Sequence, residues 1–322
     1  MENNSPMFFK SNENAAAPSL LILLGLFCIN FIFLGGLIQI GTMLLGGASL
    51  QKILTTGGDF SQIPNAWVST ILGQGLGSLV GFVGTAWLFW RVIEKKPWSD
   101  LNFKSIPSIR VFLMAILIEL TFMGFNGWLQ ELNQNIVFPE ALKGLEKTLK
   151  EMESTFEKAT QFFATFTSFW KFLLAFLVIA VIAGIGEELV FRGLLMRKIY
   201  LGTKNIHVAI WLTGFIFAII HFQFYGILPR MMLGVLFGYF YYWSGNLWVP
   251  IVAHIFNNGM IITLMYLHNI HVIKTDLENM DSLPTSIIFF SLIATIGLLF
   301  LFRNYLDKQS TDFEIKQNGE GK

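Results

Sequence analysis

The sequence predicts an all-α, polytopic membrane protein with about eight transmembrane helices and one amphipathic surface helix. Of its 322 residues, 54% are hydrophobic and only 13% are charged, whereas a soluble domain carries about 25% charged residues. The mean hydropathy is +0.59, and the apolar runs reach the ~20 residues that a helix needs to cross a bilayer. The formal net charge is +1 and no basic stripe with interleaved aromatic residues occurs, so we expect no nucleic-acid partner.

The apolar runs also define the domain organisation. We expect residues 1–18 to form a disordered tail, 19–302 a single transmembrane domain and 303–322 a cytoplasmic tail. Eight spans are predicted, and they lie at 19–45, 66–92, 111–128, 162–195, 206–224, 229–243, 247–267 and 285–302.

Glycines in the second span predict close helix packing. They follow small-xxx-small spacing, which lets two backbones approach each other, at Gly73, Gly77, Gly81 and Gly84. The preceding segment Gly46–Asn65 is rich in Gly, Ser and Thr, and we expect it to be a loop.

The segment Pro139–Thr160 differs from the apolar spans. Its large apolar side chains repeat at 3-4-3-4 spacing with Lys and Glu between them, at Leu142, Leu145, Leu149, Met152 and Phe156. This pattern predicts an amphipathic helix that lies on the membrane surface or caps the bundle. We expect it to act as an interface anchor, with a lid over a substrate entrance as the alternative.

Basic residues in short loops predict the orientation. The loops Arg91–Arg110 and Arg197–Lys204 fall on one side in an eight-span count, which places that side and both termini in the cytoplasm, at a bacterial plasma membrane. The single cysteine, Cys28, excludes an intrachain disulfide and a CxxC site. We expect Cys28 to face lipid or a neighbouring helix.

Two glutamates and an arginine lie in one of the most apolar parts of the chain, within Gly184–Arg192. Ionisable groups inside a bilayer are costly and indicate a functional site. Glu188 and Arg192 are four apart with the acid first, the favoured order for a helical ion pair. Glu187 diverges from Glu188 by ~100° and has no local counter-ion, so it is suited to acid–base chemistry. Two preceding glycines would let a backbone or substrate approach closely.

Two further polar clusters lie in later apolar spans. His221 falls in the predicted fifth span, and His254 and Asn258 share one face of the seventh, while Asn257 points elsewhere. One carboxylate, two imidazoles and an amide are sufficient for attack of water on an amide carbonyl. Glu187 can take a proton from a water that His221 orients. His254 and Asn258 can donate hydrogen bonds to the developing oxyanion.

These residues form three motifs in chain order, Glu187-Glu188-xxx-Arg192, Phe217-xxx-His221 and His254-xxx-Asn258. In these motifs the sequence resembles the CPBP family, also called the Abi or type II CAAX prenyl endopeptidase-like family, over about residues 174–266. The resemblance implies an eight-helix intramembrane glutamic-type endopeptidase, similar to CAAX prenyl protease 2, that uses no cofactor.

The resemblance also implies roles for these residues. Glu187 and His221 would activate water, His254 and Asn258 would form the oxyanion hole, and Glu188 and Arg192 would support them. The partners would be membrane lipids and a protein or lipidated peptide substrate.

Other functions stay open at the level of sequence. Glu187, His221 and His254 could be zinc ligands of a metalloprotease, although no HExxH motif occurs. A transporter or a non-enzymatic immunity scaffold would also explain intramembrane Glu and His. Glu119 could reach the site from the third span, but we expect it to pair with a neighbouring helix. Gln223, Arg230 and Asn257 could either line the cavity or face loops.

Overall fold

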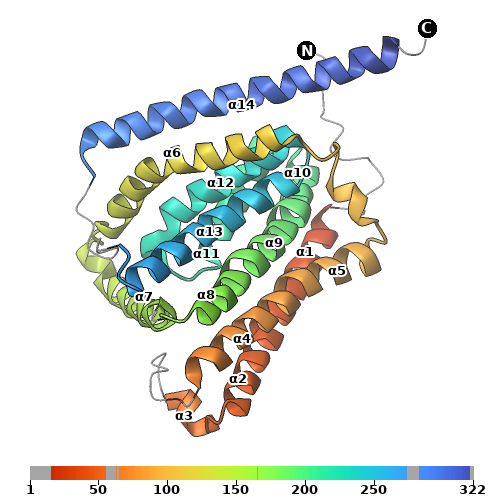
Figure 1. The fold of residues 1–322 in the computed structure, drawn as a ribbon. Coiled ribbons are helices and arrows are strands. Elements are labelled where there is room, and N and C mark those ends of the chain that lie inside the picture. The colour runs from red at the N-terminus through yellow and green to blue at the C-terminus, as the bar shows by residue number, and fades with distance from the viewer. Residues whose placement is uncertain (1–15, 56–62, 64, 165, 274–282, 320–322) are drawn as a thin grey trace.

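Every regular element is a helix in the part of the chain that the computed structural model describes, residues 16–55, 63, 65–164, 166–273 and 283–319 (Figure 1). The predicted all-α class is therefore confirmed. Within these residues, six helices are long and apolar enough to cross a membrane, namely Ala16–Leu45, Ala66–Ile93, Ile109–Gln134, Phe169–Thr203, Trp248–Asn269 and Thr285–Gln309. Six of the eight predicted spans thus have the length and composition of transmembrane helices.

Three of these long helices contain wider turns that divide them into labelled parts. The first contains α1 (Ala16–Phe27) and α2 (Gly35–Leu45), and the second contains α4 (Ala66–Ser78) and α5 (Thr85–Trp87). The fourth contains α8 (Phe169–Ala175), α9 (Ala183–Glu188) and α10 (Met196–Thr203). The remaining labelled helices are α3 (Leu50–Thr55), α6 (Ile109–Gln134), α7 (Lys143–Ala164), α11 (Ile206–Ile219), α12 (Ile227–Ser244), α13 (Trp248–Asn269) and α14 (Thr285–Gly319).

The central helices α9 to α13 lie between two outer pairs of helices (Figure 1). The first pair packs α2 against α4, as the glycine pattern predicted. A Cβ on Gly77 would lie 3.5 Å from Gly35 Cα, and Gly81 faces Phe31 in the same way. The second pair packs α6 against α14. In this arrangement Glu188 of α9, Thr213 of α11 and His254 of α13 are buried.

Glycines also allow the backbones of the central helices to pack closely. A Cβ on Gly234 of α12 would lie 3.0 Å from Gly214 Cα of α11, so these two backbones are in direct contact. A Cβ on Gly184 of α9 would lie 3.2 Å from the Ile255 backbone nitrogen of α13. The predicted close approach of another backbone at Gly184 is therefore confirmed, and it places Glu187 beside His254.

Several predicted boundaries are wrong. The fifth helix, α11, ends at Ile219 instead of continuing to 224, because the backbone turns into the left-handed region at Phe222 (φ 54°). The amphipathic helix α7 continues to Ala164, so the next helix begins at Phe169 and not at 162. That next helix also continues beyond 195 and ends at Thr203.

Other stretches expected to lack structure are partly helical. The segment 46–65 contains the short helix α3, and α14 continues through 303–319, where a tail was predicted. Most of the predicted N-terminal tail, residues 1–15, lies outside the described residues. Cys28 is exposed on the first long helix, consistent with a lipid-facing position.

Candidate functional site

A buried ion pair forms the base of the site. Arg192 Nη1 lies 2.6 Å from Glu188 Oε1, and both side chains are 0% exposed. Arg192 also donates from Nη2 to the Gly234 carbonyl at 2.8 Å. Its guanidinium lies over the rings of Phe217 and Phe237, at 4.9 Å and 5.5 Å. Removing one partner of such a pair leaves a buried charge uncompensated, so the predicted pairing is essential to this packing.

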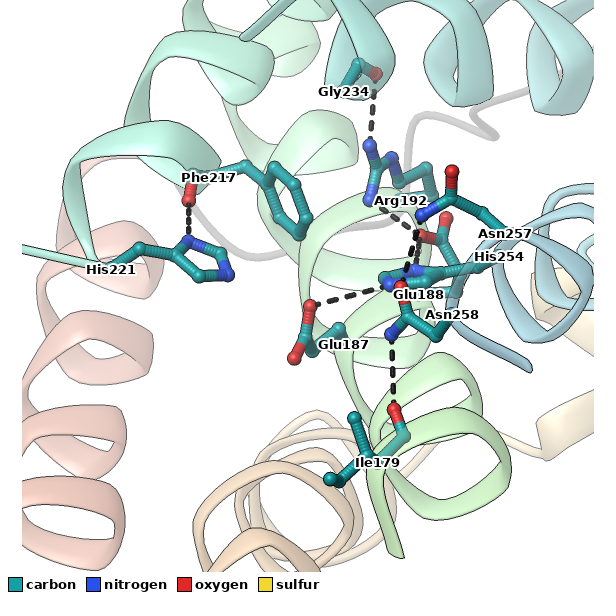
Figure 2. A network of polar contacts seen from close by, with 10 residues as sticks. All are labelled: Ile179, Glu187, Glu188, Arg192, Phe217, His221, Gly234, His254, Asn257 and Asn258. Carbon is teal, nitrogen blue, oxygen red and sulfur yellow. Dashed lines mark hydrogen bonds and ion pairs between the residues drawn. The ribbon is translucent and has the colours of Figure 1, made fainter. Parts of the chain in front are cut away.

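His254 of α13 lies between the two glutamates of α9 (Figure 2). Its Nδ1 is 2.8 Å from Glu188 Oε1, and its Nε2 is 3.7 Å from Glu187 Oε2. A carboxylate oxygen accepts, so this contact is a hydrogen bond from His254 Nδ1–H to Glu188. It orients the ring so that Nε2 lies beside Glu187.

Sequence reasoning missed the contact between Glu188 and His254. The two residues are 66 positions apart, and helical spacing reveals only partners on the same helix. Glu188 therefore has a second function beyond its pair with Arg192, which is to hold His254 in place.

Glu187 is the more accessible of the two glutamates, with 12% of its side chain exposed. Its carboxylate and the His221 ring are directed into the same space, beside the Phe217 ring (Figure 2). The structure describes no hydrogen bond or ion pair between Glu187 and His221. A water or a substrate carbonyl could lie between them.

His221 is not inside a helix, contrary to the sequence prediction. It follows the last turn of α11, and its Nδ1–H donates to the Phe217 carbonyl at 2.8 Å. This hydrogen bond fixes the tautomer, so the Nε2 lone pair remains available as an acceptor.

Asn258 lies on α13 one turn after His254, as predicted. Its Nδ2 donates to the Ile179 carbonyl at 3.0 Å, and its Oδ1 accepts from Asn257 Nδ2 at 3.0 Å. The prediction that Asn257 points elsewhere is therefore wrong, since neighbouring side chains can bend toward each other. Asn258 retains one further Nδ2–H for another acceptor.

Glu119 of α6 is 3% exposed, and neither carboxylate oxygen has a hydrogen-bond partner among the described residues. The expected pairing with a neighbouring helix is thus not present. Glu119 lies close enough to Glu188 for their charges to interact.

The structure describes no group of three or more His, Cys, Asp or Glu side chains in an arrangement that could hold a metal ion. The proposed zinc set of Glu187, His221 and His254 is thus not assembled in the described geometry, because only His254 directly contacts a carboxylate. Metal independence remains a prediction.

A helical membrane bundle with a buried Glu–His–Asn cluster is the class of protein that the fold and the site define. Within it, residues 169–260 match the model of the family described as Type II CAAX prenyl endopeptidase Rce1-like. The resemblance seen in the three motifs is confirmed over this segment, which contains all six residues singled out above.

Three bacterial relatives are similar over part of the chain. "Uncharacterized protein YpbD" of Bacillus subtilis is 36% identical over 72 residues, covering 21% of this chain and 33% of the relative. "Putative membrane peptidase YdiL" of the same organism is 29% identical over 91 residues, covering 28% and 37%. "Membrane-embedded CAAX protease MroQ" of Staphylococcus aureus is 27% identical over 95 residues, covering 28% and 38%.

The matched part therefore spans only about a third of the length of these curated relatives. No solved structure gives a significant match. The similarity points to membrane proteases, and the apolar helices support an integral membrane protein.

Proposed function

We propose that this protein is an intramembrane endopeptidase that hydrolyses a peptide bond with a water activated by Glu187 and His221. The observation that carries the proposal is the position of His254 between the two carboxylates, with Glu187 directed toward His221 (Figure 2). A candidate base, an orienting imidazole and a second imidazole that can donate thus lie around one space.

The reaction would proceed in two steps. The water oxygen attacks the carbonyl carbon while Glu187 takes a water proton, and the Nε2 lone pair of His221 accepts a hydrogen bond from the same water. The carbonyl oxygen becomes an oxyanion that accepts hydrogen bonds from His254 Nε2–H and the free Nδ2–H of Asn258. Glu187 then delivers its proton to the leaving nitrogen as the C–N bond breaks, which releases an acid and an amine.

Glu188 and Arg192 are positioning residues in this scheme. Glu188 keeps His254 oriented, and Arg192 holds Glu188 in place through their ion pair. The substrate would be a membrane-associated or lipidated protein, processed in the manner of a CAAX-type substrate, as the relatives suggest.

The test compares the membrane proteomes of cells that carry the native protein with cells that carry Glu187→Gln. New C-terminal or juxtamembrane fragments that depend on Glu187 would support proteolysis and identify the substrate. Glu151→Gln is a matched control, because Glu151 is an exposed α7 residue whose ion pair is with Lys147 of the same helix. Identical proteomes, or cleavage that persists in Glu187→Gln, would refute the proposal. A cellular phenotype retained without Glu187 would favour a non-enzymatic scaffold.

A further inference from the structure

The amphipathic helix α7 contacts the turn that carries His221. Glu153 of α7 accepts hydrogen bonds from Gln223 Nε2 and from the Tyr225 backbone N–H, each at 3.3 Å. Both residues belong to the segment between α11 and α12, which begins directly after α11 and includes His221. A carboxylate from α7 is thereby held next to the candidate site.

Arg230, in the first turn of α12, completes this cluster. Its Nη2 donates to Gln223 Oε1 at 2.6 Å, whereas its Nη1 is buried and has no hydrogen-bond partner among the described residues. The guanidinium packs directly over Gly226, where an added Cβ would lie 2.2 Å from Nη1. A glycine at this position leaves room for the arginine head beside the backbone.

The charge of Arg230 is incompletely compensated. Its side chain donates to a neutral amide oxygen, and the two Glu153 oxygens accept from Gln223 and Tyr225 instead. Glu153 acts on Arg230 only through longer-range electrostatics. The Arg230 side chain as a whole is only partly buried, and the exposed edge of a guanidinium can contact a carboxylate through two parallel N–H bonds.

The location of Arg230 connects it with the chemistry. Arg230 donates to the side chain of Gln223, which follows His221 by two residues in the same turn. A carboxylate bound to Arg230 would therefore be held near the turn that carries His221.

We propose that Arg230 is a specificity-determining residue that binds a carboxylate of the substrate, and that the nearby negative charge of Glu153 of α7 weakens this binding. The inference rests on the proposed function and identifies one recognition element of the same site. Two sources supply the same chemistry, the C-terminal carboxylate of a peptide and an Asp or Glu side chain within it.

The test measures binding and does not require cleavage. The full chain carrying Glu187→Gln is placed in nanodiscs of zwitterionic lipid, and fluorescence anisotropy reports binding of fluorescein-labelled Leu-Val-Ala-Phe-Leu-Ala. Three forms of the probe are compared: the free C-terminal acid, the C-terminal amide, and an amide in which the second-last residue is Glu. Each probe partitions into lipid to the same extent for every protein variant, so comparing variants with one probe isolates the contribution of Arg230.

We expect at least one carboxylate form to bind about tenfold or more tightly than the plain amide, as a charge-assisted contact predicts. Arg230→Gln should remove this preference and leave the affinity for the plain amide unchanged, while Arg230→Lys should retain part of it. Arg303→Gln is the matched control, since Arg303 is 61% exposed on α14 and pairs with Asp307. The preferred probe form identifies the source of the carboxylate.

A second variant keeps the test decisive if Arg230→Gln does not fold. Glu153→Gln should increase the preference for the carboxylate probe, whereas Glu151→Gln on the same helix should not. Equal binding of all three probe forms, or a preference that neither Arg230→Gln nor Glu153→Gln changes, would overturn the inference. Loss of proteolysis with an intact carboxylate preference would instead count against the proposed function alone.

Discussion

His254 Nδ1 lies 2.8 Å from Glu188 Oε1, although the two residues come from different helices and are 66 positions apart. Glu188 is 0% exposed and His254 3%, so this contact is shielded from water. The same Glu188 oxygen accepts from Arg192. The positions of the imidazole, the carboxylate and the guanidinium are therefore interdependent.

The first prediction concerns Glu188. Glu188→Leu should lower the free energy of unfolding by about 3–5 kcal/mol, because it leaves the Arg192 guanidinium buried without a counter-ion. Adding Arg192→Leu should recover most of this stability, since an apolar pair can replace a buried ion pair. The double variant should stay inactive because His254 has lost its acceptor. Thermal unfolding in detergent and a cleavage assay measure the two effects, and an active double variant would contradict the role given to Glu188.

The second prediction concerns His221. His221→Ala should reduce kcat by about 10²–10⁴-fold, the range typical of a lost acid–base group, with little change in thermal stability. His207→Ala is the control, because His207 is exposed and its Nδ1 lies 2.8 Å from the Tyr239 hydroxyl of α12. A comparable loss of activity in both variants would show that His221 has no special function.

The third prediction separates the two asparagines of α13. Asn258→Ala should lower kcat by about 10²–10³-fold, the effect expected for removing one oxyanion donor. Asn257→Ala should have a smaller effect, because Asn257 only donates to Asn258 Oδ1. Single-turnover cleavage rates measure both, and the reverse order would place the oxyanion donor at Asn257.

The fourth prediction uses the contact between α9 and α13. In Gly184→Ala the new methyl group would lie 2.9 Å from Ile255 Cγ1 and 3.2 Å from the Ile255 nitrogen, so α13 must shift. We expect about 1–3 kcal/mol of destabilisation together with reduced kcat, because His254 moves relative to Glu187. Gly36→Ala is the control, since no atom lies within 4 Å of its added Cβ. Full activity in Gly184→Ala would show that the site tolerates this displacement.

Local spacing predicted several features that the structure contains. The ion pair of Glu188 and Arg192 depends on a four-residue interval within one helix, and the glycines of α4 depend on a repeat within one helix. Periodicity likewise predicted the amphipathic α7, although its end is four residues further along. The end of α11 was not predictable in this way, because the apolar residues continue beyond the left-handed turn at Phe222.

The sequence by itself determined that this is a helical membrane protein with a few polar side chains in otherwise apolar helices. Composition sets that class, because a bilayer requires backbone hydrogen bonds to be satisfied within each span. Only the tertiary structure decided which of those side chains contact one another. His254 contacts both glutamates, and Glu153 of α7 lies beside the His221 turn. Such contacts depend on the packing and register of separate helices, which the spacing of residues within a single helix does not contain.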